Sequence, residues 1–463
     1  MEAGRYTAAI HIYRGLLRAL PQNIGLTLDL GLALHSAGRY QEAVPQFEKV
    51  VRQEPDKAPV WLLLGLDELH LQQPVRAQQA LERVVRLEPG NRKAHLELAE
   101  CFMDLQRPAE AATHFERAAK LDPQDPKAWQ GIGLAYVALS QGTYAEVEKV
   151  PGGKAYAKVL MAQSLMNRNQ FHLAFELYRE ALADNPGLRA AYEGLATIYQ
   201  KSGHADWSTV ERAKEQQLPP LNCQTQPVEC DFQARRYRQV LKKTSQSHSA
   251  ETLYWRAMAF EQLAQRAFDH LRNLPPSPAA YGLMAEAYRI LGRYDLAVVE
   301  WEKALKLAPN DAYVQEGLAK ALWLNRQYGE AKQWLEKIIA KNPEDPNLNF
   351  ELGDSLLYSQ ENAAKALPYL EKAVRGAPRD LAARAALGRA YVRLNEPAKA
   401  IPCFKASLSF GPQGTIYYQL AQAYERAGEH ALGKQAMAQF EAISKAAQAR
   451  KRKDLEGMQI LPP

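Results

Sequence analysis

Residues 58–91, APVWLLLGLDELHLQQPVRAQQALERVVRLEPGN, decide the fold of this chain, because they form one complete repeat. The positions that define it are Trp61, Leu64, Gly65, Ala77, Leu81, Val84 and Pro89. Apolar residues recur at helical spacing in both halves of the segment. Proline cannot continue a helical hydrogen-bond ladder, so Pro89 marks the end of the second half. The segment therefore predicts two antiparallel helices, with small residues where their backbones approach each other.

The same pattern recurs with a fixed period along the chain. Prolines stand 34 residues apart at Pro21, Pro55, Pro89 and Pro123. After an irregular middle with Pro186 they resume at Pro309, Pro343, Pro378 and Pro412, spaced 34, 35 and 34. Small and large residues recur in phase with them, as at Gly31 with Phe47, Ala99 with Phe115, Ala285 with Trp301, Gly353 with Leu370, and Gly388 with Phe404. A fixed period of this length is the signature of a repeat architecture.

At these positions the chain resembles tetratricopeptide-repeat (TPR) proteins of the long bacterial multi-repeat type, over nearly its whole length. The resemblance implies an all-α fold, a right-handed superhelix of antiparallel helix pairs. It also implies a concave groove, lined by the first helix of each pair, that holds a protein or peptide. We therefore expect a non-catalytic scaffold or adaptor. The alternative is a substrate-recognition or assembly subunit that acts in trans for a larger enzyme or secretion complex.

We divide the chain into four segments. These are an N-terminal repeat array at 1–204, an irregular helical joint with a cysteine-containing loop at 205–277, a C-terminal array at 278–446, and a basic and polar tail at 447–463. Residues 4–21 fit only the second half of a repeat, so we expect the natural protein to extend upstream, with a signal peptide as one form of that extension. Further short helices are expected at 144–150, 231–243, 250–263 and 265–274.

Two of the four cysteines, Cys223 and Cys230, flank a proline-bearing loop. A disulfide between them would close a loop of about eight residues and contribute on the order of 2.5 kcal/mol. Two free thiols and a metal site are the alternatives, although neither a CxxC spacing nor a histidine cluster supports zinc. A disulfide favours an exported or periplasmic location over the cytoplasm. Cys101 and Cys403 are expected to be packing residues.

The sequence contains no phosphate-binding loop, nucleophile elbow or HExxH motif, so we predict no enzyme activity, catalytic residue, metal or cofactor. The net charge of +6 is mild, and much of the excess lies within 445–453 rather than along a stripe. We therefore expect no nucleic-acid partner. No apolar run approaches the ~20 residues that span a bilayer. Nothing in the sequence indicates the oligomeric state.

The first helices of the N-terminal array supply the candidate groove residues Leu62, Leu66, Leu69, Glu100 and Met103. The helix around Leu62 is apolar on all sides, which is typical of a helix buried on both sides. Either neighbouring repeats cover these leucines, or they form an apolar strip for a partner, since exposed apolar area of that kind marks a binding site.

The C-terminal array carries alternating charges after the small position of each first helix. These are Glu286, Lys320, Asp354 and Arg389, and the nearby aromatic candidates are Trp323, Phe350 and Tyr418. Stacked helices would bring the charges together, so one interpretation is a salt-bridge ladder. The other is a groove whose aromatic rings hold a partner's side chains.

Overall fold

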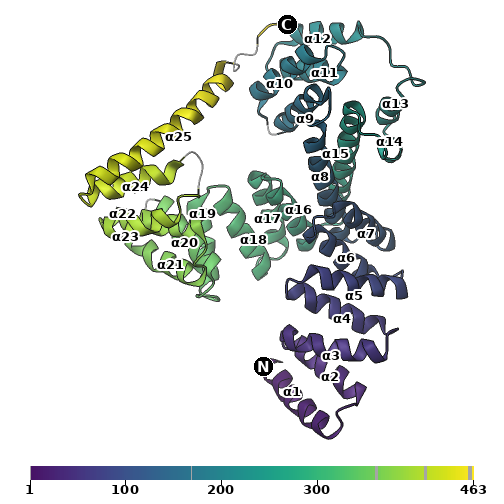
Figure 1. The fold of residues 1–463 in the computed structure, drawn as a ribbon, viewed down its shortest axis with the longest axis vertical. Helices are drawn as coiled ribbons and strands as arrows, with labels where there is room; N and C mark the ends of the chain where they lie inside the picture. Colours follow the sequence, from purple (N-terminus) through teal and green to yellow (C-terminus); the bar gives the residue numbers. More distant parts are fainter. Residues whose placement is uncertain (1, 168, 360–362, 411–413, 457–460) are drawn as a thin grey trace. The chain divides into compact units, whose positions relative to one another are not determined.

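The computed structural model describes residues 2–167, 169–359, 363–410, 414–456 and 461–463. Helices follow one another in antiparallel pairs, and the described ranges contain no β-strand (Figure 1). The prediction of an all-α superhelix of helix pairs is therefore confirmed. In each pair we call the N-terminal member the first helix and the other the second helix.

The chain divides into two compact bodies. The first body comprises residues 1–160 and 219–274, and the second comprises residues 161–218 and 275–463. The helices of the first body are α1 (Glu2–Ala19), α2 (Ile24–Ser36), α3 (Tyr40–Gln53), α4 (Ala58–His70), α5 (Pro74–Leu87), α6 (Arg92–Asp104), α7 (Pro108–Leu121), α8 (Pro126–Val147), α13 (Pro227–Gln233), α14 (Tyr237–Thr244) and α15 (Ala250–Arg272). The helix α9 (Gly153–Asn167) begins in the first body and ends in the second.

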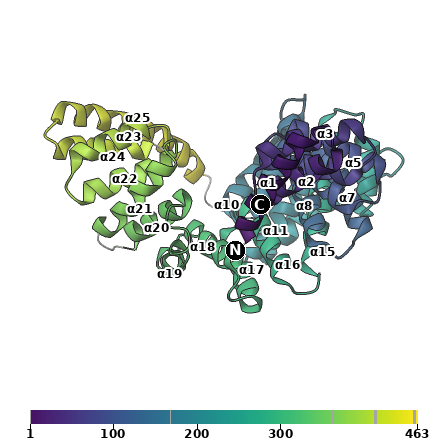
Figure 2. The ribbon, with the colours of Figure 1, turned by 90° about the horizontal axis from the view of Figure 1, so that it is seen from below.

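The second body holds the remaining helices, and Figure 2 shows the pairs near the C-terminus from another side. They are α10 (Phe171–Asp184), α11 (Arg189–Lys201), α12 (Ala205–Gln216), α16 (Pro278–Ile290), α17 (Tyr294–Leu307), α18 (Ala312–Leu324), α19 (Tyr328–Ile339), α20 (Pro346–Tyr358), α21 (Ala363–Gly376), α22 (Leu381–Arg393), α23 (Pro397–Ala406), α24 (Thr415–Arg426) and α25 (His430–Glu456).

Each helix pair closes where a small residue of the first helix faces a large one of the second. A Cβ atom added at Gly31 of α2 would lie 2.7 Å from the Phe47 ring of α3. One added at Gly353 of α20 would lie 2.6 Å from Leu370 of α21. Only glycine permits these contacts, since interiors are too closely packed to take an added methyl group without a shift. The small–large pairs of the sequence therefore correspond to inter-helix contacts.

The first helices begin at a recurring cap. The side chain of the residue before the helix accepts a hydrogen bond from a backbone N–H of the first turn. This occurs at Asn23, Asn91, Asp125, Asp311, Asp345 and Asp380. Such a cap satisfies one of the N–H groups that have no partner within the helix. A proline stands two residues before each of these six caps, in the connection between helices, so local sequence chemistry sets where each repeat restarts.

Two long helices correct the expected helix boundaries. The predicted separate helix at 144–150 is wrong, because α8 runs unbroken to Val147. The predicted break between 250–263 and 265–274 is also wrong, because α15 is one helix of 23 residues. The two helices pack along each other, which stabilises both beyond the length that their local patterns predict.

Side-chain contacts run the length of the α8–α15 interface. A Cβ atom added at Gly133 of α8 would lie 2.4 Å from the Phe268 ring of α15. Farther along, Ser140 donates a hydrogen bond to the Ala257 carbonyl oxygen at 3.2 Å. Thus α15 places a large ring over the small residue of α8, as a following second helix does elsewhere, although 135 residues separate the two positions.

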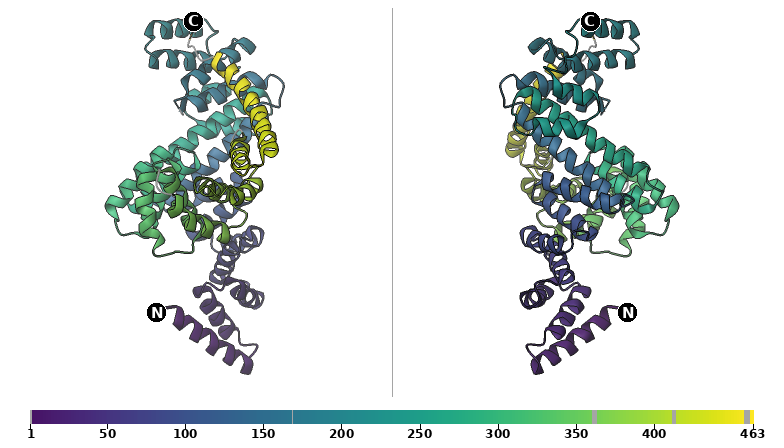
Figure 3. Two further views of the ribbon diagram at one scale, coloured as in Figure 1. Left: turned by 90° about the vertical axis from the view of Figure 1, so that its left-hand side faces the viewer. Right: turned by 90° about the vertical axis from the view of Figure 1, so that its right-hand side faces the viewer.

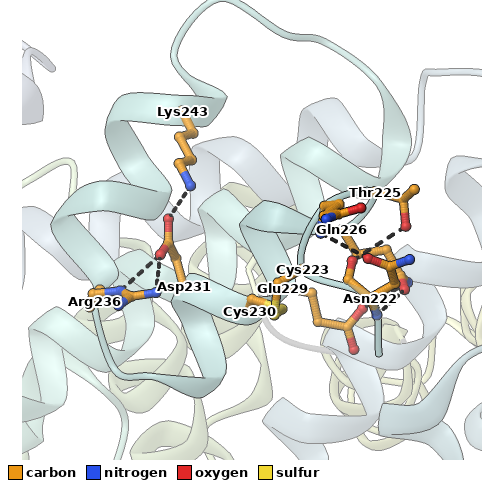
Figure 4. Close-up of a disulfide and its surroundings, with 10 residues drawn as sticks. Asn222, Cys223, Thr225, Gln226, Glu229, Cys230, Asp231, Arg236 and Lys243 are labelled. Atoms are coloured by element: carbon orange, nitrogen blue, oxygen red, sulfur yellow. Dashed lines mark hydrogen bonds and ion pairs between the residues drawn. A yellow bond between two sulfur atoms is a disulfide. The ribbon is translucent and has the colours of Figure 1, made fainter. Parts of the chain in front are cut away.

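The joint contains the predicted disulfide, and the predicted single helix after it is wrong. Cys223 and Cys230 are bonded, with their Cα atoms 5.6 Å apart (Figure 4). Residues 231–243 are not one helix, because Arg235 takes a positive φ of 56° and separates α13 from α14. The Asp231 carboxylate then links the two helices through ion pairs to Arg236 at 2.7 Å and Lys243 at 2.6 Å (Figure 4).

Among the residues that the structure describes, no helix has both the length and the apolar character that crossing a membrane requires.

A histidine pair, His95 of α6 and His114 of α7, joins two helices of the first body. Nδ1 of His95 lies 2.9 Å from Nδ1 of His114, and Nε2 of His95 lies 3.1 Å from the Pro89 carbonyl oxygen. A carbonyl only accepts, so Nε2 of His95 donates to it and Nδ1 of His95 accepts from His114. Burial lowers the pKa of both histidines. Burial therefore favours the neutral form of both side chains in the folded protein.

We expect acidification to destabilise α6 and α7 through this pair. As the pH falls below the ordinary histidine range, the unfolded chain binds protons that the folded chain excludes, so stability decreases toward the lowered folded pKa values. Urea midpoints at pH 7.5 and 5.5 measure the effect, and the His95→Gln/His114→Gln variant should lose much of the difference. His11→Gln, at an exposed histidine of α1, serves as the control. An equal pH dependence in all three proteins would contradict this assignment.

Candidate partner-binding surfaces

A strip of apolar side chains follows the first helices of the first body. We define the leucine strip as Leu32 of α2, Leu62, Leu66 and Leu69 of α4, Met103 of α6, and Leu134 and Val137 of α8. Leu32 is 39% exposed and the others are half-buried. Leu32, Leu66 and Leu134 occupy one register of the repeat, and Leu69, Met103 and Val137 occupy another. Equivalent positions on consecutive first helices thus carry apolar side chains that the fold does not fully cover.

One member of the strip also belongs to the core. Leu62 packs against the buried cluster of Ala58, Val84 and Ala94, which joins α4, α5 and α6. Its half-buried side chain therefore packs against the core on one side and is accessible to a partner on the other. The two interpretations of this leucine, core packing and groove lining, are compatible at the same residue.

The predicted groove residue Glu100 takes part in an ion pair. Its carboxylate lies 2.7 Å from Nζ of Lys127 on α8, and Glu97 lies 3.7 Å from the same ammonium. Burial raises the pKa of Glu100, and Lys127 opposes that shift. The pair links α6 to α8, and it interrupts the leucine strip with charge at the position between Leu66 and Leu134.

A buried carboxylate beside the leucine strip was not predicted from the sequence. Asp67 of α4 is fully buried, and its Oδ1 lies 2.5 Å from Nδ1 of His35 on α2. Burial raises the pKa of Asp67, and the hydrogen bond from His35 opposes that shift. The sequence pattern that could have indicated it is an acidic residue inside an apolar first helix, with a histidine near the end of the preceding first helix. The pair joins α2 to α4, and the described residues contain no group of three side chains that could hold a metal ion.

In the second body, Asp354 connects three first helices. We define the Asp354 network as Trp323 of α18, Asp354 of α20 and Arg389 of α22. Trp323 donates from Nε1 to Asp354 at 3.1 Å, and Arg389 donates to the other carboxylate oxygen at 2.9 Å. Burial raises the pKa of Asp354, while the Arg389 guanidinium opposes that shift. The network uses three predicted site residues and fixes the orientation of the tryptophan ring.

The other alternating charges are placed differently. Glu286 pairs with Arg289 of its own helix at 2.6 Å. Lys320 is exposed, and its charge acts on the buried Glu351 of the next first helix. Burial raises the pKa of Glu351 to about 7. A pair between first helices thus exists at Asp354–Arg389, whereas Glu286 is satisfied within α16.

Aromatic rings surround the Asp354 network. The Trp323 and Phe350 rings meet edge to face, with centroids 5.4 Å apart. Tyr358 stacks on Tyr328 at 4.6 Å and is 48% exposed, with the Arg389 guanidinium over its ring. Aromatic faces next to a charged pair can contact both apolar and cationic side chains of a partner.

The predicted site residue Tyr418 lies on α24, near the end of the array. Its ring centroid is 5.2 Å from that of Phe440 on α25, and 41% of its surface is exposed. Tyr418 therefore packs partly against its own repeat and leaves the rest of its ring to solvent.

Two sequence models, both described as tetratricopeptide repeat, match the chain. One matches residues 62–126, and the other matches residues 1–66, 289–349 and 357–424. Together they cover more than half of the chain. No curated protein matches the sequence.

Several solved structures of MamA match part of the chain. MamA MSR-1 is 24% identical over 37% of this chain and 98% of its own length, with a TM-score of 0.33. MamA from Desulfovibrio magneticus RS-1 is 20% identical over 36% of this chain and 96% of its own, with a TM-score of 0.32. Another MamA crystal structure is 17% identical over 45% of this chain and 94% of its own, with a TM-score of 0.25.

Proposed function

Because this chain belongs to the tetratricopeptide-repeat family, we propose that it is a scaffold whose first helices bind a segment of another protein. The repeat fold supports an interaction role in general. The leucine strip is the observation that carries the proposed binding mode. The Cys223–Cys230 disulfide supports an oxidising compartment as the place where the scaffold works.

The leucine strip has the properties of a surface that a partner completes. Full burial of one leucine stabilises by about 1.5–3 kcal/mol. Because the strip residues are half-exposed, part of that free energy remains to be gained when a partner covers them. Their shared register places them on successive helices, so a partner with an apolar face could contact several at once. A few such residues usually carry most of the binding energy of an interface.

In the second body we propose a contact of a different character. Tyr358 and Lys320 are exposed beside the Asp354 network, whereas Asp354 is buried and paired with Arg389 at 2.9 Å. A partner would therefore bind the aromatic faces and the exposed Lys320 ammonium. Separating the buried pair would leave an uncompensated charge at a high energetic cost.

The first experiment tests the leucine strip by quantitative affinity capture from the source cells. We expect Leu66→Lys to reduce the recovery of a specific partner at least tenfold, because a charge at the centre of an apolar interface is costly to desolvate (~1.4 kcal/mol per tenfold). Val75→Lys is the matched control, since Val75 is a 57% exposed apolar residue on the second helix α5.

Circular dichroism should give the same helix content for both variants and the wild type. Equal recovery of every partner with Leu66→Lys and Val75→Lys would refute binding by the strip. Lys320→Glu in the same assay tests the second body. Unchanged recovery of every partner with this variant would show that the charges of the second body have only a structural role.

A further inference from the structure

Residues 461–463, Leu-Pro-Pro, contact a tyrosine that lies far away in the sequence. The hydroxyl of Tyr199, on the first helix α11, donates a hydrogen bond to the carbonyl oxygen of Leu461 at 2.7 Å, although 262 positions separate the two residues. Both residues belong to the second body. In Figure 1 the C-terminal mark lies beside α12, and in both views of Figure 3 it lies beside the same teal helices. The segment therefore contacts the helix pair of α11 and α12.

Tyr199 belongs to an aromatic cluster that spans three helices. Its ring meets the Phe175 ring of α10 and the Trp207 ring of α12 edge to face, with centroids 5.7 and 5.6 Å away. The His204 ring, directly before α12, stacks on Trp207 at 4.0 Å. Tyr199 is 2% exposed, whereas Trp207 and His204 are half-buried. We define the Tyr199 site as Tyr199, His204 and Trp207, in which the neighbouring rings fix the position of the tyrosine hydroxyl.

The register of the repeats explains why this hydroxyl takes its acceptor from a distant segment. In α8 and α22 a tyrosine occupies the same repeat position, three residues after the small residue. Each of those tyrosines donates to a glutamate 20 residues earlier, on the preceding second helix, and the pairs are Tyr136–Glu116 and Tyr391–Glu371. The equivalent residue for Tyr199 is Arg179, and a guanidinium only donates hydrogen bonds. The carbonyl oxygen of Leu461 therefore supplies the acceptor that this repeat lacks at that position.

The Tyr199 hydroxyl acts as a donor throughout the physiological pH range. Burial raises the pKa of Tyr199 to about 12, so the hydroxyl keeps its proton. A buried donor without a partner destabilises a fold, because it has lost its hydrogen bond to water. The Tyr199 hydroxyl therefore favours the binding of a segment that brings a carbonyl oxygen to this point.

The sequence of the segment explains why its carbonyl oxygen is available. Proline has no backbone N–H and a fixed φ, and the residue before a proline is restricted to extended conformations. Leu461 precedes Pro462 and Pro463, so neither of the next two residues can donate a hydrogen bond back to its carbonyl oxygen. Such a segment loses little conformational entropy when it binds, and aromatic residues of other proteins recognise proline-containing extended segments for this reason.

We propose that the Tyr199 site binds an extended Leu-Pro-Pro segment of a partner protein, and that residues 461–463 occupy the site from within the chain. The carbonyl oxygen of the partner's leucine accepts the hydrogen bond from the Tyr199 hydroxyl, as that of Leu461 does here. Leu461 is 42% exposed and both prolines are exposed, so the internal occupant is covered only in part and can exchange with a partner. The site lies in the second body, and it does not depend on the leucine strip.

A tail variant of the full-length chain, Leu461→Gly/Pro462→Gly/Pro463→Gly, tests whether the internal segment occupies the site. The probe is a labelled, amidated peptide with the sequence of residues 457–463, measured by fluorescence anisotropy. We expect the tail variant to bind the probe at least about tenfold more tightly than the wild type, in which the tethered segment competes at a high effective concentration. Equal binding to the two proteins, or no binding to the tail variant, would overturn the proposal.

Removing one hydroxyl group tests the contact itself. Tyr199→Phe, added to the tail variant, keeps the ring and should weaken probe binding about threefold or more, the loss expected for one hydrogen bond. Tyr192→Phe is the matched control, because Tyr192 of the same helix donates to the Pro186 carbonyl oxygen at 3.1 Å, in the turn before α11. The control should bind the probe as the tail variant does. If both variants have the same helix content by circular dichroism and the same affinity, the Tyr199 hydroxyl does not bind the segment and the proposal fails.

Two unrelated peptides test whether a partner's segment can use the site. The amidated peptide Ser-Ser-Leu-Pro-Pro-Ser-Ser shares only three residues with the probe and should displace it from the tail variant with similar affinity. Ser-Ser-Leu-Ala-Ala-Ser-Ser should compete at least about threefold more weakly, because without prolines the unbound peptide has more conformations to lose. Failure of the first peptide to compete would show that recognition needs the residues around 461–463 of this chain, which would refute a partner's segment as the ligand.

Sedimentation of the wild type examines the other possible occupant. A dimer that the tail variant dissociates would assign the Tyr199 site to residues 461–463 of a second copy, and would overturn a partner protein as the source of the segment. We expect the wild type and the tail variant to sediment alike.

Discussion

Replacing Trp301 with alanine is expected to destabilise the repeats around α17 by about 3–5 kcal/mol, the range for a large aromatic side chain deleted from a core. Trp301 is 1% exposed and fills the space between α16 and α18. Cβ atoms added at Gly282 and Gly317 would lie 3.0 and 2.3 Å from its ring. Gly282 and Gly317 have no side chains that could fill the cavity left by the ring.

Hydrogen exchange of the amides in α16–α19 measures this loss, because repeats unfold locally and a single global midpoint would average over the array. Trp334→Ala is the matched control. Trp334 is half-buried beneath the Lys337 ammonium, so its loss should cost much less. The loss of protection in Trp301→Phe should lie between the losses in Trp301→Ala and Trp334→Ala. Removing Nε1 of Trp301 breaks no hydrogen bond, because this atom is buried without a partner in the described part of the chain. Equal protection in Trp301→Ala and Trp334→Ala would show that Trp301 is not the anchor of these repeats.

Replacing Gly133 with leucine is expected to separate α15 from α8. Even a Cβ atom there would lie 2.4 Å from the Phe268 ring, so a leucine cannot fit without moving a helix. Overpacking of this kind costs about 1–3 kcal/mol or more. The change should lower the urea midpoint of the first body and increase hydrogen exchange in α15.

The control lies on the same helix. No atom would lie within 4 Å of a Cβ at Gly142 of α8, and removing glycine from a helix interior gains about 0.5–1 kcal/mol. Gly142→Ala should therefore stabilise. The double variant Gly133→Leu/Phe268→Ala should be more stable than the two separate losses predict, because the leucine can enter the space of the ring. Strict additivity would indicate that the two residues do not contact each other in solution.

The repeats were predictable because their determinants are local. The cap at Asp345, the small residue Gly353 and the large residue Leu370 lie within one repeat, and each acts on neighbours close in sequence. The same holds for the disulfide, since Cys223 and Cys230 are seven residues apart. Asp354 and Arg389 were predicted from the register and Trp323 as a nearby aromatic residue, and the structure joins the three through hydrogen bonds.

The positions of the buried acids were not predictable in this way. Whether Asp67 is solvated or buried depends on the side chains of α2 around it, and its partner His35 is 32 residues away. Likewise, Glu351 has its unusual pKa because neighbouring repeats cover it, which the sequence of α20 alone does not indicate.

The sequence by itself determined the repeat, the all-α fold and the register that assigns each residue to a helix face. Those features follow from periodic contacts between residues at most one repeat apart. Only the tertiary structure decided that α8 and α15 are long unbroken helices packed together, because Gly133 and Phe268 are far apart in sequence and no period relates them. It also decided which surface remains open. Leu16 of α1 resembles a core residue in sequence, yet the structure leaves it 43% exposed, because burial depends on which helices pack against a side chain.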